Sequence, residues 1–287
     1  MTGIIIKGIG GFYYVKTTDG IFRAKGRGAL KRDGFTLAVG DSVDIEIRDD
    51  GDSVITDVHE RKNSFIRPPI ANVDRFIIVA AAAKPKPNFE IIDRFLIMAE
   101  KNNTEAVICI NKSDLADSEF LESIKRMYAD VYPVVFASAK EKTGTEELAP
   151  YISGAKVAFA GPSGVGKSSL INLLIPEANM ETGKVSSKTA IGKHTTRHVE
   201  MFESHGVYVF DTPGFTSFDI LDVEEDELAD YYPEIAKYSG GCRFDNCRHI
   251  KEPDCAVIEA VEEGKISQAR YKSYVSNIEE IRKRKKY

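Results

Sequence analysis

The sequence predicts three domains: an N-terminal β-barrel of the OB type, a central α/β domain with a mostly parallel sheet, and a C-terminal α-helical domain. Three observations predict this organisation. The 287 residues exceed what one hydrophobic core usually holds. The apolar period is two residues near the start, and after Asp74 apolar strands alternate with amphipathic helices. Three cysteines and a histidine gather near the end. We expect domains at residues 1–66, 67–218 and 219–287.

The first domain is predicted to contain five short strands separated by glycine-rich turns. In the fourth strand Val43, Ile45 and Ile47 alternate with acidic residues, which indicates a strand with one buried face. Five short strands of this kind are typical of the OB barrel. The strands are expected near Ile4–Ile6, Phe12–Thr17, Ile21–Ala24, Val43–Ile47 and Val54–Val58.

Local basic and aromatic residues of the barrel are candidates for RNA contact, although the net charge of −5 excludes a general electrostatic coating of nucleic acid. Tyr13, Tyr14, Phe22 and Arg23 suit a nucleic-acid-binding face, while core packing alone would also explain the aromatic rings. Two basic stretches stand out, and a solvated surface is the alternative for each. They are Arg23, Lys25, Arg27, Lys31 and Arg32, and Arg282, Lys283, Arg284, Lys285 and Lys286.

The central domain follows the pattern of strand and helix in alternation, which predicts a parallel sheet covered by helices. Strands are expected at Phe76–Ala82, Ala106–Ile110, Val134–Ala137, Lys156–Ala160 and Val207–Phe210, and helices at Phe89–Lys101, Glu119–Tyr128 and Ser168–Leu174.

A phosphate-binding loop follows the strand Lys156–Ala160 and opens a helix, which is the context that such a loop requires. It reads Gly161-Pro162-Ser163-Gly164-Val165-Gly166-Lys167-Ser168, and Ser169 continues the helix. We expect backbone N–H groups to bind the phosphates, Lys167 to reach the β- and γ-phosphates, and Ser168 to ligate Mg²⁺. Asp211 is expected to hold the metal through water, and the Gly214 N–H to contact the γ-phosphate.

A second motif, Asn111-Lys112-Ser113-Asp114, predicts selection of guanine. The Asp114 carboxylate can accept hydrogen bonds from guanine N1 and N2, which adenine cannot offer. Loss of one such charge-assisted bond costs roughly 1.5–3 kcal/mol. Asn111 and Lys112 are expected to brace the base pocket. Ser138-Ala139-Lys140 fits the auxiliary loop that contacts the base.

The guanine motif precedes the phosphate-binding loop, whereas ordinary GTPase domains have the opposite order. A nucleotide pocket is defined in space by loops at one sheet edge, so the chain can be cut and rejoined elsewhere without loss of the pocket. The sequence therefore predicts a circularly permuted P-loop GTPase that hydrolyses GTP to GDP and phosphate. The segment after Gly214 then connects the phosphate-sensing loop directly to the last domain.

Residues Thr182–Val199 lack periodicity and predict a mobile loop that completes the Mg²⁺ shell. We favour Thr196 as that ligand, with Thr195 as the alternative. Phe215 stands where many GTPases carry a glutamine that orients water. His194 is the candidate for this catalytic role, and a solvated loop histidine is the other interpretation.

Cys242, Cys247, His249 and Cys255 predict one structural zinc ion, because four protein ligands leave no open position for catalysis. Unconnected buried cysteines are the alternative. Disulfides are not expected, since three cysteines cannot pair evenly and no export signal is visible. Cys109 lies in an apolar strand and is expected to be a core residue. Helices are predicted at Ala256–Val261 and Ile266–Ile281.

Together the barrel, the permuted motifs, the later Asp211-Thr212-Pro213-Gly214 and the spacing Cys-x₄-Cys-x-His-x₅-Cys resemble the bacterial small ribosomal subunit biogenesis GTPase A family over essentially the whole chain. Its His-Thr-Thr segment matches His194-Thr195-Thr196, and its hydrophobic residue after the Asp-x-x-Gly motif matches Phe215. The resemblance implies a GTPase that binds the small subunit and its rRNA late in maturation, is stimulated by it, and leaves after hydrolysis.

Two other functions are left open by the residues themselves. One is an RNA-binding scaffold in which guanine nucleotide is structural, and the other is a P-loop kinase for a small metabolite, which the guanine motif disfavours. No run of about 18 apolar residues exists. Met1–Ile9 also lacks the features of a secretion signal. We therefore expect a cytoplasmic monomer without a membrane partner.

Overall fold

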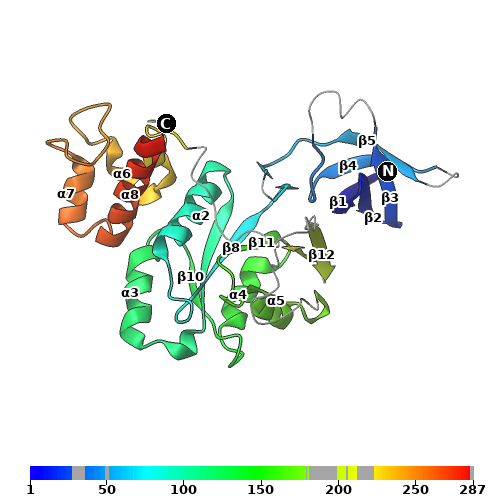
Figure 1. Cartoon of the computed structure of the whole chain (residues 1–287), viewed down its shortest axis with the longest axis horizontal. Helices are drawn as coiled ribbons and strands as arrows, with labels where there is room; N and C mark the ends of the chain where they lie inside the picture. Colours follow the sequence, from blue (N-terminus) through cyan, green and yellow to red (C-terminus); the bar gives the residue numbers. More distant parts are fainter. Residues whose placement is uncertain are drawn as a thin grey trace. The chain divides into compact units, whose positions relative to one another are not determined.

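The computed structural model describes residues 1–27, 36–48, 52–66, 68–178, 180, 199–204, 206–211 and 223–284. Figure 1 follows the chain by colour from the blue barrel strands through the cyan and green α/β elements to the orange and red helices. The chain forms two units. Unit 1 contains residues 1–77, 146–160 and 167–216, and unit 2 contains residues 78–145, 161–166 and 217–287.

The N-terminal part of unit 1 is a closed five-stranded barrel, as the sequence predicted. Strands β1, β2 and β3 pair antiparallel, β3 pairs parallel with β5, β5 pairs antiparallel with β4, and β4 returns to β1. The inward side chains of Ile5, Val15, Ala24, Val43 and Ile55 are fully buried. The strands are β1 (Thr2–Ile9), β2 (Phe12–Thr17), β3 (Gly20–Gly26), β4 (Ser42–Glu46) and β5 (Ser53–Val58).

The rest of unit 1 contributes strands and helices of the α/β part. Strand β11 (Lys156–Ala160) pairs parallel with β13 (Val207–Asp211), and β12 (Glu200–Ser204) pairs antiparallel with β13. The other elements are β6 (Ser64–Phe65), β7 (Ile70–Ala71), most of α4 (Thr145–Ile152), α5 (Lys167–Leu174) and the 3-10 turn η2 (Pro176–Ala178).

Barrel and α/β strands are packed closely within unit 1. Gly40 has φ +97°, and a Cβ there would lie 2.1 Å from the Ala71 carbonyl oxygen and 2.9 Å from the Phe210 ring. Any larger residue would push the barrel from β13. Strand β1 also meets β12, where Lys7 pairs with Glu200.

The α/β part of unit 2 is built around strands in the order β10-β9-β8, with β10 and β9 parallel. Nearly all residues of β8 and β9 are buried, as expected for parallel strands covered on both faces. Asn88 caps α2, and Asp117 caps α3. The elements are β8 (Arg75–Ala81, beginning in unit 1), α2 (Phe89–Lys101), β9 (Glu105–Asn111), η1 (Ser113–Leu115), α3 (Ser118–Tyr128) and β10 (Val134–Phe136).

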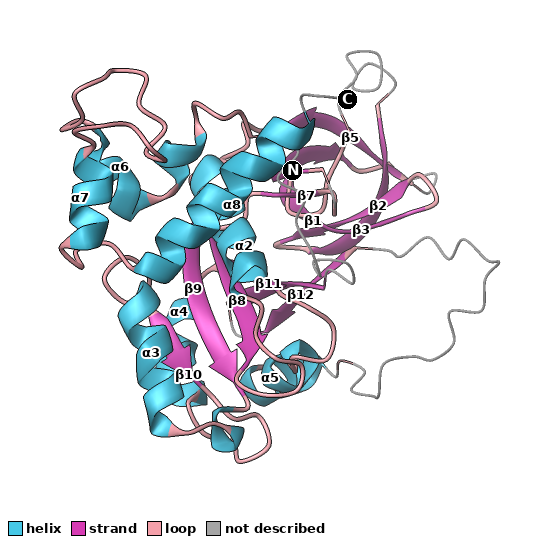
Figure 2. Cartoon of the chain, turned by 60° about the vertical axis from the view of Figure 1, so that its left-hand side comes forward, coloured by secondary structure: helices cyan, strands magenta, loops and turns pink. Residues whose placement is uncertain are grey.

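The C-terminal part of unit 2 is helical. It contains η4 (Leu228–Tyr231), α6 (Pro233–Ser239), α7 (Ala256–Glu262) and α8 (Gln268–Arg284), so the last helix begins two residues later and ends three residues later than predicted. Its buried core includes Ile235, Val257 and Ile278, and Ile97 from α2 joins them. Figures 1 and 2 show α8 beside α2. The helical part therefore shares its core with the α/β part.

A buried arginine of α8 forms ion pairs with α2 and α6. The Arg270 side chain is 1% exposed, and it donates to Asp93 of α2 at 2.5 Å and to Glu234 of α6 at 2.6 Å. Its guanidinium carbon lies 5.4 Å from the Tyr128 ring and 4.5 Å from the Tyr232 ring, within the range of cation–π attraction. Sequence reasoning gave no role to Arg270.

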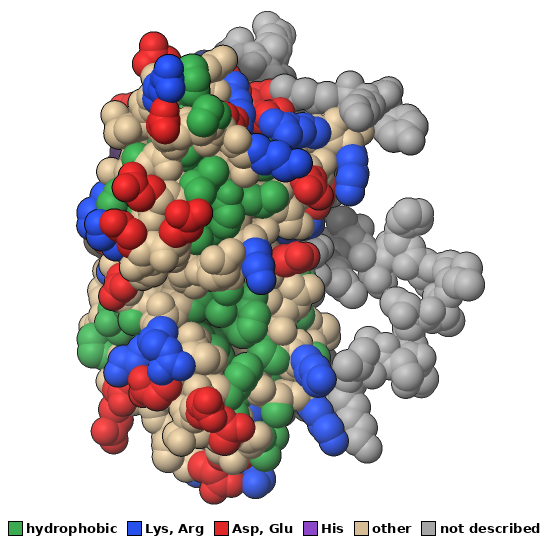
Figure 3. Space-filling view, turned by 90° about the vertical axis from the view of Figure 1, so that its left-hand side faces the viewer, with side chains coloured by type: hydrophobic (Ala, Val, Ile, Leu, Met, Phe, Trp, Pro, Cys, Tyr) green, Lys and Arg blue, Asp and Glu red, His purple; other side chains and the backbone are tan. Residues whose placement is uncertain are grey.

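One face of the molecule carries charges of both signs (Figure 3). Figure 3 shows acidic and basic side chains interspersed on the face that lies to the left in Figure 1, with apolar side chains between them. Within the described ranges, none of the helices has the length and apolar character needed to span a membrane.

Candidate nucleotide-binding site and metal centre

The phosphate-binding loop turns sharply between β11 and α5. Gly161, Gly164 and Gly166 have φ values of +138°, +81° and +98°. A Cβ on Gly161 would lie 2.1 Å from the Val79 carbonyl oxygen, and one on Gly166 would lie 2.2 Å from Asn111 Nδ2. Glycine is therefore required at both positions by backbone conformation and by space.

Within this loop Ser163 and Gly164 are exposed, Pro162 is half-buried, and Val165 is buried. Ser163 and Gly164 are therefore accessible from solvent, and the buried valine anchors the turn. Because β11 leads into the loop and α5 begins at Lys167, the strand–loop–helix context expected from the sequence is present.

Asn111 connects the phosphate-binding loop with the loop 138–140, for which the sequence predicted contact with the base. It ends β9 and is 1% exposed. Its Nδ2 donates to the Val165 carbonyl at 2.8 Å, and its Oδ1 accepts from the Ala139 N–H at 3.0 Å. One side chain thus fixes two loops whose bonded residues lie 54 and 28 residues away along the chain.

Lys112 reinforces this arrangement. Its backbone is left-handed, with φ +60°, and its Nζ donates to the Gly164 carbonyl at 2.8 Å and to the Lys84 carbonyl at 2.6 Å. Two acceptors hold the ammonium against the phosphate loop. The lysine therefore braces the site.

The next residues of the guanine motif form the short turn η1. Asp114 is exposed there, and the Ser113 N–H donates to the Ala137 carbonyl at 3.1 Å. In the neighbouring loop the Ser138 hydroxyl accepts from the Glu141 N–H at 3.1 Å. Lys140 is exposed, and its hydrogen bond to Glu141 raises its pKa, with the negative charge of Asp114 adding to the effect. The acidic group of Asp114 is thus available to a ligand.

Lys167 stands at the start of α5, followed by the half-buried Ser168 and Ser169. Burial lowers the pKa of Lys167 to about 8, because desolvation disfavours the ammonium form. An anion beside this group would raise its pKa again, because it favours the ammonium form. Asp211 ends β13, in register with Glu200 of β12.

Other predicted site residues lie outside the described residues. These are His194, Thr195 and Thr196 in the segment 181–198, and Gly214 and Phe215 in the segment 212–222.

Cys242, Cys247, His249 and Cys255 come together in the helical part of unit 2, with their ligand atoms all within 4.8 Å of one another. Cys242 Sγ and Cys255 Sγ each lie 3.4 Å from His249 Nδ1, and the two sulfurs are 3.7 Å apart. This group could hold a metal ion. The Cys109 thiol is fully buried elsewhere, as expected, and burial raises its pKa to about 12.

Ser239 orients the histidine of this cluster, and no sequence signal pointed to it. Its hydroxyl donates to the Ile235 carbonyl at 2.9 Å, so its oxygen can accept from His249 Nε2 at 3.2 Å. A proton on Nε2 leaves Nδ1 as the lone-pair donor toward the sulfurs. Burial lowers the pKa of His249, which favours the neutral ring.

The Glu252 carboxylate holds the loop that carries His249 through hydrogen bonds to its backbone. Its carboxylate accepts from the backbone N–H groups of Arg248, Ile250 and Lys251 at 2.8–2.9 Å. The sequence did not predict this role, because a carboxylate three residues after a histidine is not a recognisable motif.

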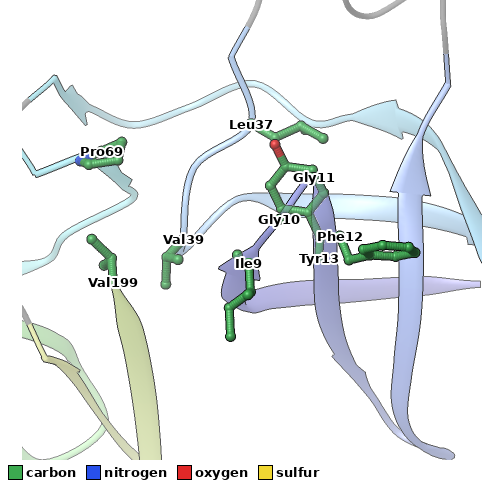
Figure 4. Close-up of a pocket in the computed structure, with 10 residues that line it drawn as sticks. Ile9, Gly10, Gly11, Phe12, Tyr13, Leu37, Val39, Pro69 and Val199 are labelled. Carbon is green, nitrogen blue, oxygen red and sulfur yellow. The ribbon is translucent and has the colours of Figure 1, made fainter. Parts of the chain in front are cut away.

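A separate cavity of about 280 Å³ lies in unit 1 at the tip of the β1–β2 hairpin. Its lining is mainly apolar and includes Ile9, Tyr13, Val39, Pro69 and Val199 (Figure 4).

Comparison with known proteins identifies the family. Residues 58–221 match the family described as RsgA GTPase, and residues 2–55 match the RsgA N-terminal domain. The chain belongs to the RsgA GTPase family. It is 45% identical to the small ribosomal subunit biogenesis GTPase RsgA of Clostridium perfringens, strain SM101, over 98% of both chains. It is 44% identical to the protein of that name from Alkaliphilus metalliredigens, over 99% of both chains.

Solved structures agree over the whole length. The crystal structure of YjeQ from Thermotoga maritima matches with a TM-score of 0.85 and 36% identity, covering 98% of each chain. YloQ, described as a circularly permuted GTPase, matches with a TM-score of 0.83 and 36% identity, covering 99% of this chain and 95% of its own. The predictions of a barrel, a circularly permuted GTPase domain and GTP hydrolysis are thus confirmed.

Proposed function

We propose that this GTPase acts in late maturation of the small ribosomal subunit, binding the subunit in its GTP form and leaving after hydrolysis. The observation that carries the proposal is the match, at 45% identity over 98% of both chains, to a relative named for small ribosomal subunit biogenesis. A ligand can shift binding of a partner only if it binds two conformations with different affinity. GTP and GDP are the two ligands that would do so here.

In the proposed site Asp114 accepts from guanine N1 and N2, while Asn111 and Lys112 hold the surrounding loops through the contacts described above. The N–H groups of Gly161–Gly166 and the Lys167 ammonium contact the phosphates, with Ser169 next along the helix. Magnesium would be held by Ser168 and Thr196, and by Asp211 through water. When bound, it neutralises charge on the β- and γ-phosphate oxygens.

For the hydrolytic step we propose His194 as the group that positions the attacking water, since Phe215 has no polar atom for this purpose. His194→Ala should lower turnover while GTP affinity stays unchanged. Turnover close to that of the wild type would show that another group positions the water.

The Cys₃His cluster is proposed to bind one structural zinc ion. Zinc–sulfur bonds of about 2.3 Å in a tetrahedron place two sulfurs about 3.8 Å apart, and the observed separation of 3.7 Å supports this choice. Four protein ligands leave no position for substrate, so the ion would stabilise the fold of the C-terminal helices.

The proposed partners are the small subunit and its rRNA, contacted through the barrel and the zinc-binding domain, with domain limits near 1–66, 67–218 and 219–287. The protein is proposed to act as a monomer in the cytoplasm, where ribosomal subunits mature.

Hydrolysis of GTP by the purified protein, with and without purified small ribosomal subunits, tests the proposal. Lys167→Ala controls for contaminating activity. Acceleration by orders of magnitude is expected with the subunit. Turnover that does not respond to it, together with equal subunit affinity in GDP and a nonhydrolysable GTP analogue, would instead favour the scaffold hypothesis.

A further inference from the structure

The outer face of β2 and β3 carries an aromatic and basic cluster that is already occupied by a carboxylate. Tyr14 of β2 pairs in register with Arg23 of β3, and the side chains of Val15 and Ala24, one residue along each strand, are fully buried. Alternation along a strand therefore puts Phe12, Tyr14, Arg23 and Lys25 on the outward face.

The two cations converge on the Phe12 ring. The Arg23 guanidinium carbon lies 4.8 Å and the Lys25 ammonium 4.5 Å from its centroid. Phe12 is one of the residues that line the apolar cavity, and Figure 4 shows its ring pointing away from Pro69 and Val199 on the opposite wall. Aromatic rings with flanking cations on this face of an OB barrel suit single-stranded nucleic acid.

Asp52 neutralises part of this cluster. Strands β3 and β5 run parallel with Ala24 opposite Ser53, which sets the preceding residue, Asp52, beside Arg23. Its Oδ1 accepts from Arg23 Nε at 2.5 Å, and its Oδ2 lies 3.2 Å from Lys25 Nζ. Both oxygens of one carboxylate thus engage the two cations that a phosphate would need.

These ion pairs are exposed enough to exchange. The Arg23 and Lys25 side chains are 54% and 56% exposed, and that of Asp52 is 20% exposed. Exposed pairs contribute little net stability, so a phosphate can replace the carboxylate. Partial desolvation would raise the pKa of Asp52, but hydrogen bonds from Arg23 and Lys25 lower it overall, so the carboxylate is ionised at neutral pH.

We propose that Asp52 is a built-in competitor for RNA phosphate at the Arg23–Lys25–Phe12 cluster, and that it weakens binding of single-stranded RNA by the free barrel. The inference rests on the proposed role in ribosome maturation. It adds a residue, Asp52, that sets how strongly an RNA must bind before it contacts the barrel. An RNA that binds weakly has to displace Asp52 before it can contact the two cations. A ribosomal subunit makes several contacts at once and can therefore displace Asp52.

Asp52→Asn is the test, with binding of a labelled oligouridine of about 12 nucleotides, enough for one OB fold, measured by fluorescence anisotropy. The full chain with GDP bound is titrated from about 50 to 200 mM salt. Freeing one positive charge should steepen the slope of log affinity against log salt by about 0.7, which corresponds to about fivefold tighter binding at 0.1 M salt.

Asp57→Asn is the matched control, because it removes an exposed carboxylate from β5 of the same barrel, away from the cluster. A gain of less than twofold is expected for this control. Arg23→Ala in the Asp52→Asn background should abolish most of the gain. Circular dichroism and thermal unfolding verify that each variant is folded.

Equal gains in Asp52→Asn and Asp57→Asn would overturn the proposal, because general charge would then explain the effect. Absence of any change in Asp52→Asn, or of RNA binding by either protein, would overturn it as well. Subunit-stimulated GTP hydrolysis is measured separately on wild type. Absence of stimulation by the subunit refutes the ribosomal role. If the subunit stimulates GTP hydrolysis but the RNA titration is the same for Asp52→Asn and wild type, only the role of Asp52 is refuted.

Discussion

Arg270→Ala is expected to destabilise unit 2 strongly, because it leaves two buried carboxylates without their cation. Asp93 is 1% and Glu234 10% exposed, and each accepts one hydrogen bond from Arg270 at 2.5 and 2.6 Å. Removing one partner of a buried ion pair costs about 3–5 kcal/mol. A typical domain has only about 5–15 kcal/mol of stability in total.

Urea unfolding measures this loss. The chain has no tryptophan and twelve tyrosines, and the rings of Tyr128, Tyr132 and Tyr232 lie within 6 Å of the Arg270 guanidinium carbon. Tyrosine fluorescence therefore reports on the region around Arg270. With a urea slope of about 2 kcal/mol per molar, the midpoint should fall by roughly 1.5–2.5 M.

Arg282→Ala on the same helix is the control. Its side chain is 46% exposed and pairs with Glu225, so the loss should be within about 1 kcal/mol. If Arg270→Ala lowers the free energy of unfolding by no more than Arg282→Ala does, the buried ion pair does not hold the C-terminal helices on α2. The apolar contacts around Ile97 would then be enough to hold them there.

Three further outcomes are expected. Asp114→Ala should weaken GDP binding about ten- to a hundredfold, as calorimetry would measure, and unchanged affinity would remove Asp114 from the base pocket. Because phosphate raises the pKa of Lys167 above its free value of about 8, GDP affinity should be flat below that pH and fall as pH rises from 8 toward 9. In a Lys167→Arg variant the GDP affinity should fall over this pH range only as far as titration of the nucleotide itself requires. If the GDP affinities of both proteins fall in parallel with pH, Lys167 is not the group that titrates. Ser239→Ala removes the acceptor for His249 Nε2 and should increase the rate of zinc loss to a chelator about tenfold or more, whereas an unchanged rate would mean that Ser239 does not orient the ligand.

The sequence by itself determined the features whose chemistry is local. Gly161–Ser168 is one continuous stretch, and its glycines, lysine and serine have roles that depend on neighbouring backbone. The order of Asn111–Asp114 and Gly161–Ser168 likewise revealed the permutation, because chain order is a property of sequence. The short alternating strands predicted the barrel, since a period of two specifies which face is buried.

Only the tertiary structure decided which distant residues meet. Asn111 bonding to Val165 and Ala139, Ser239 beside His249, and Asp52 between two cations of another strand all depend on packing between elements far apart in the chain. Arg270 is the clearest case, because its partner Asp93 lies 177 residues earlier. In the sequence it is one arginine in a polar helix. Burial against two carboxylates and three aromatic rings, which no local pattern encodes, makes it a structural anchor.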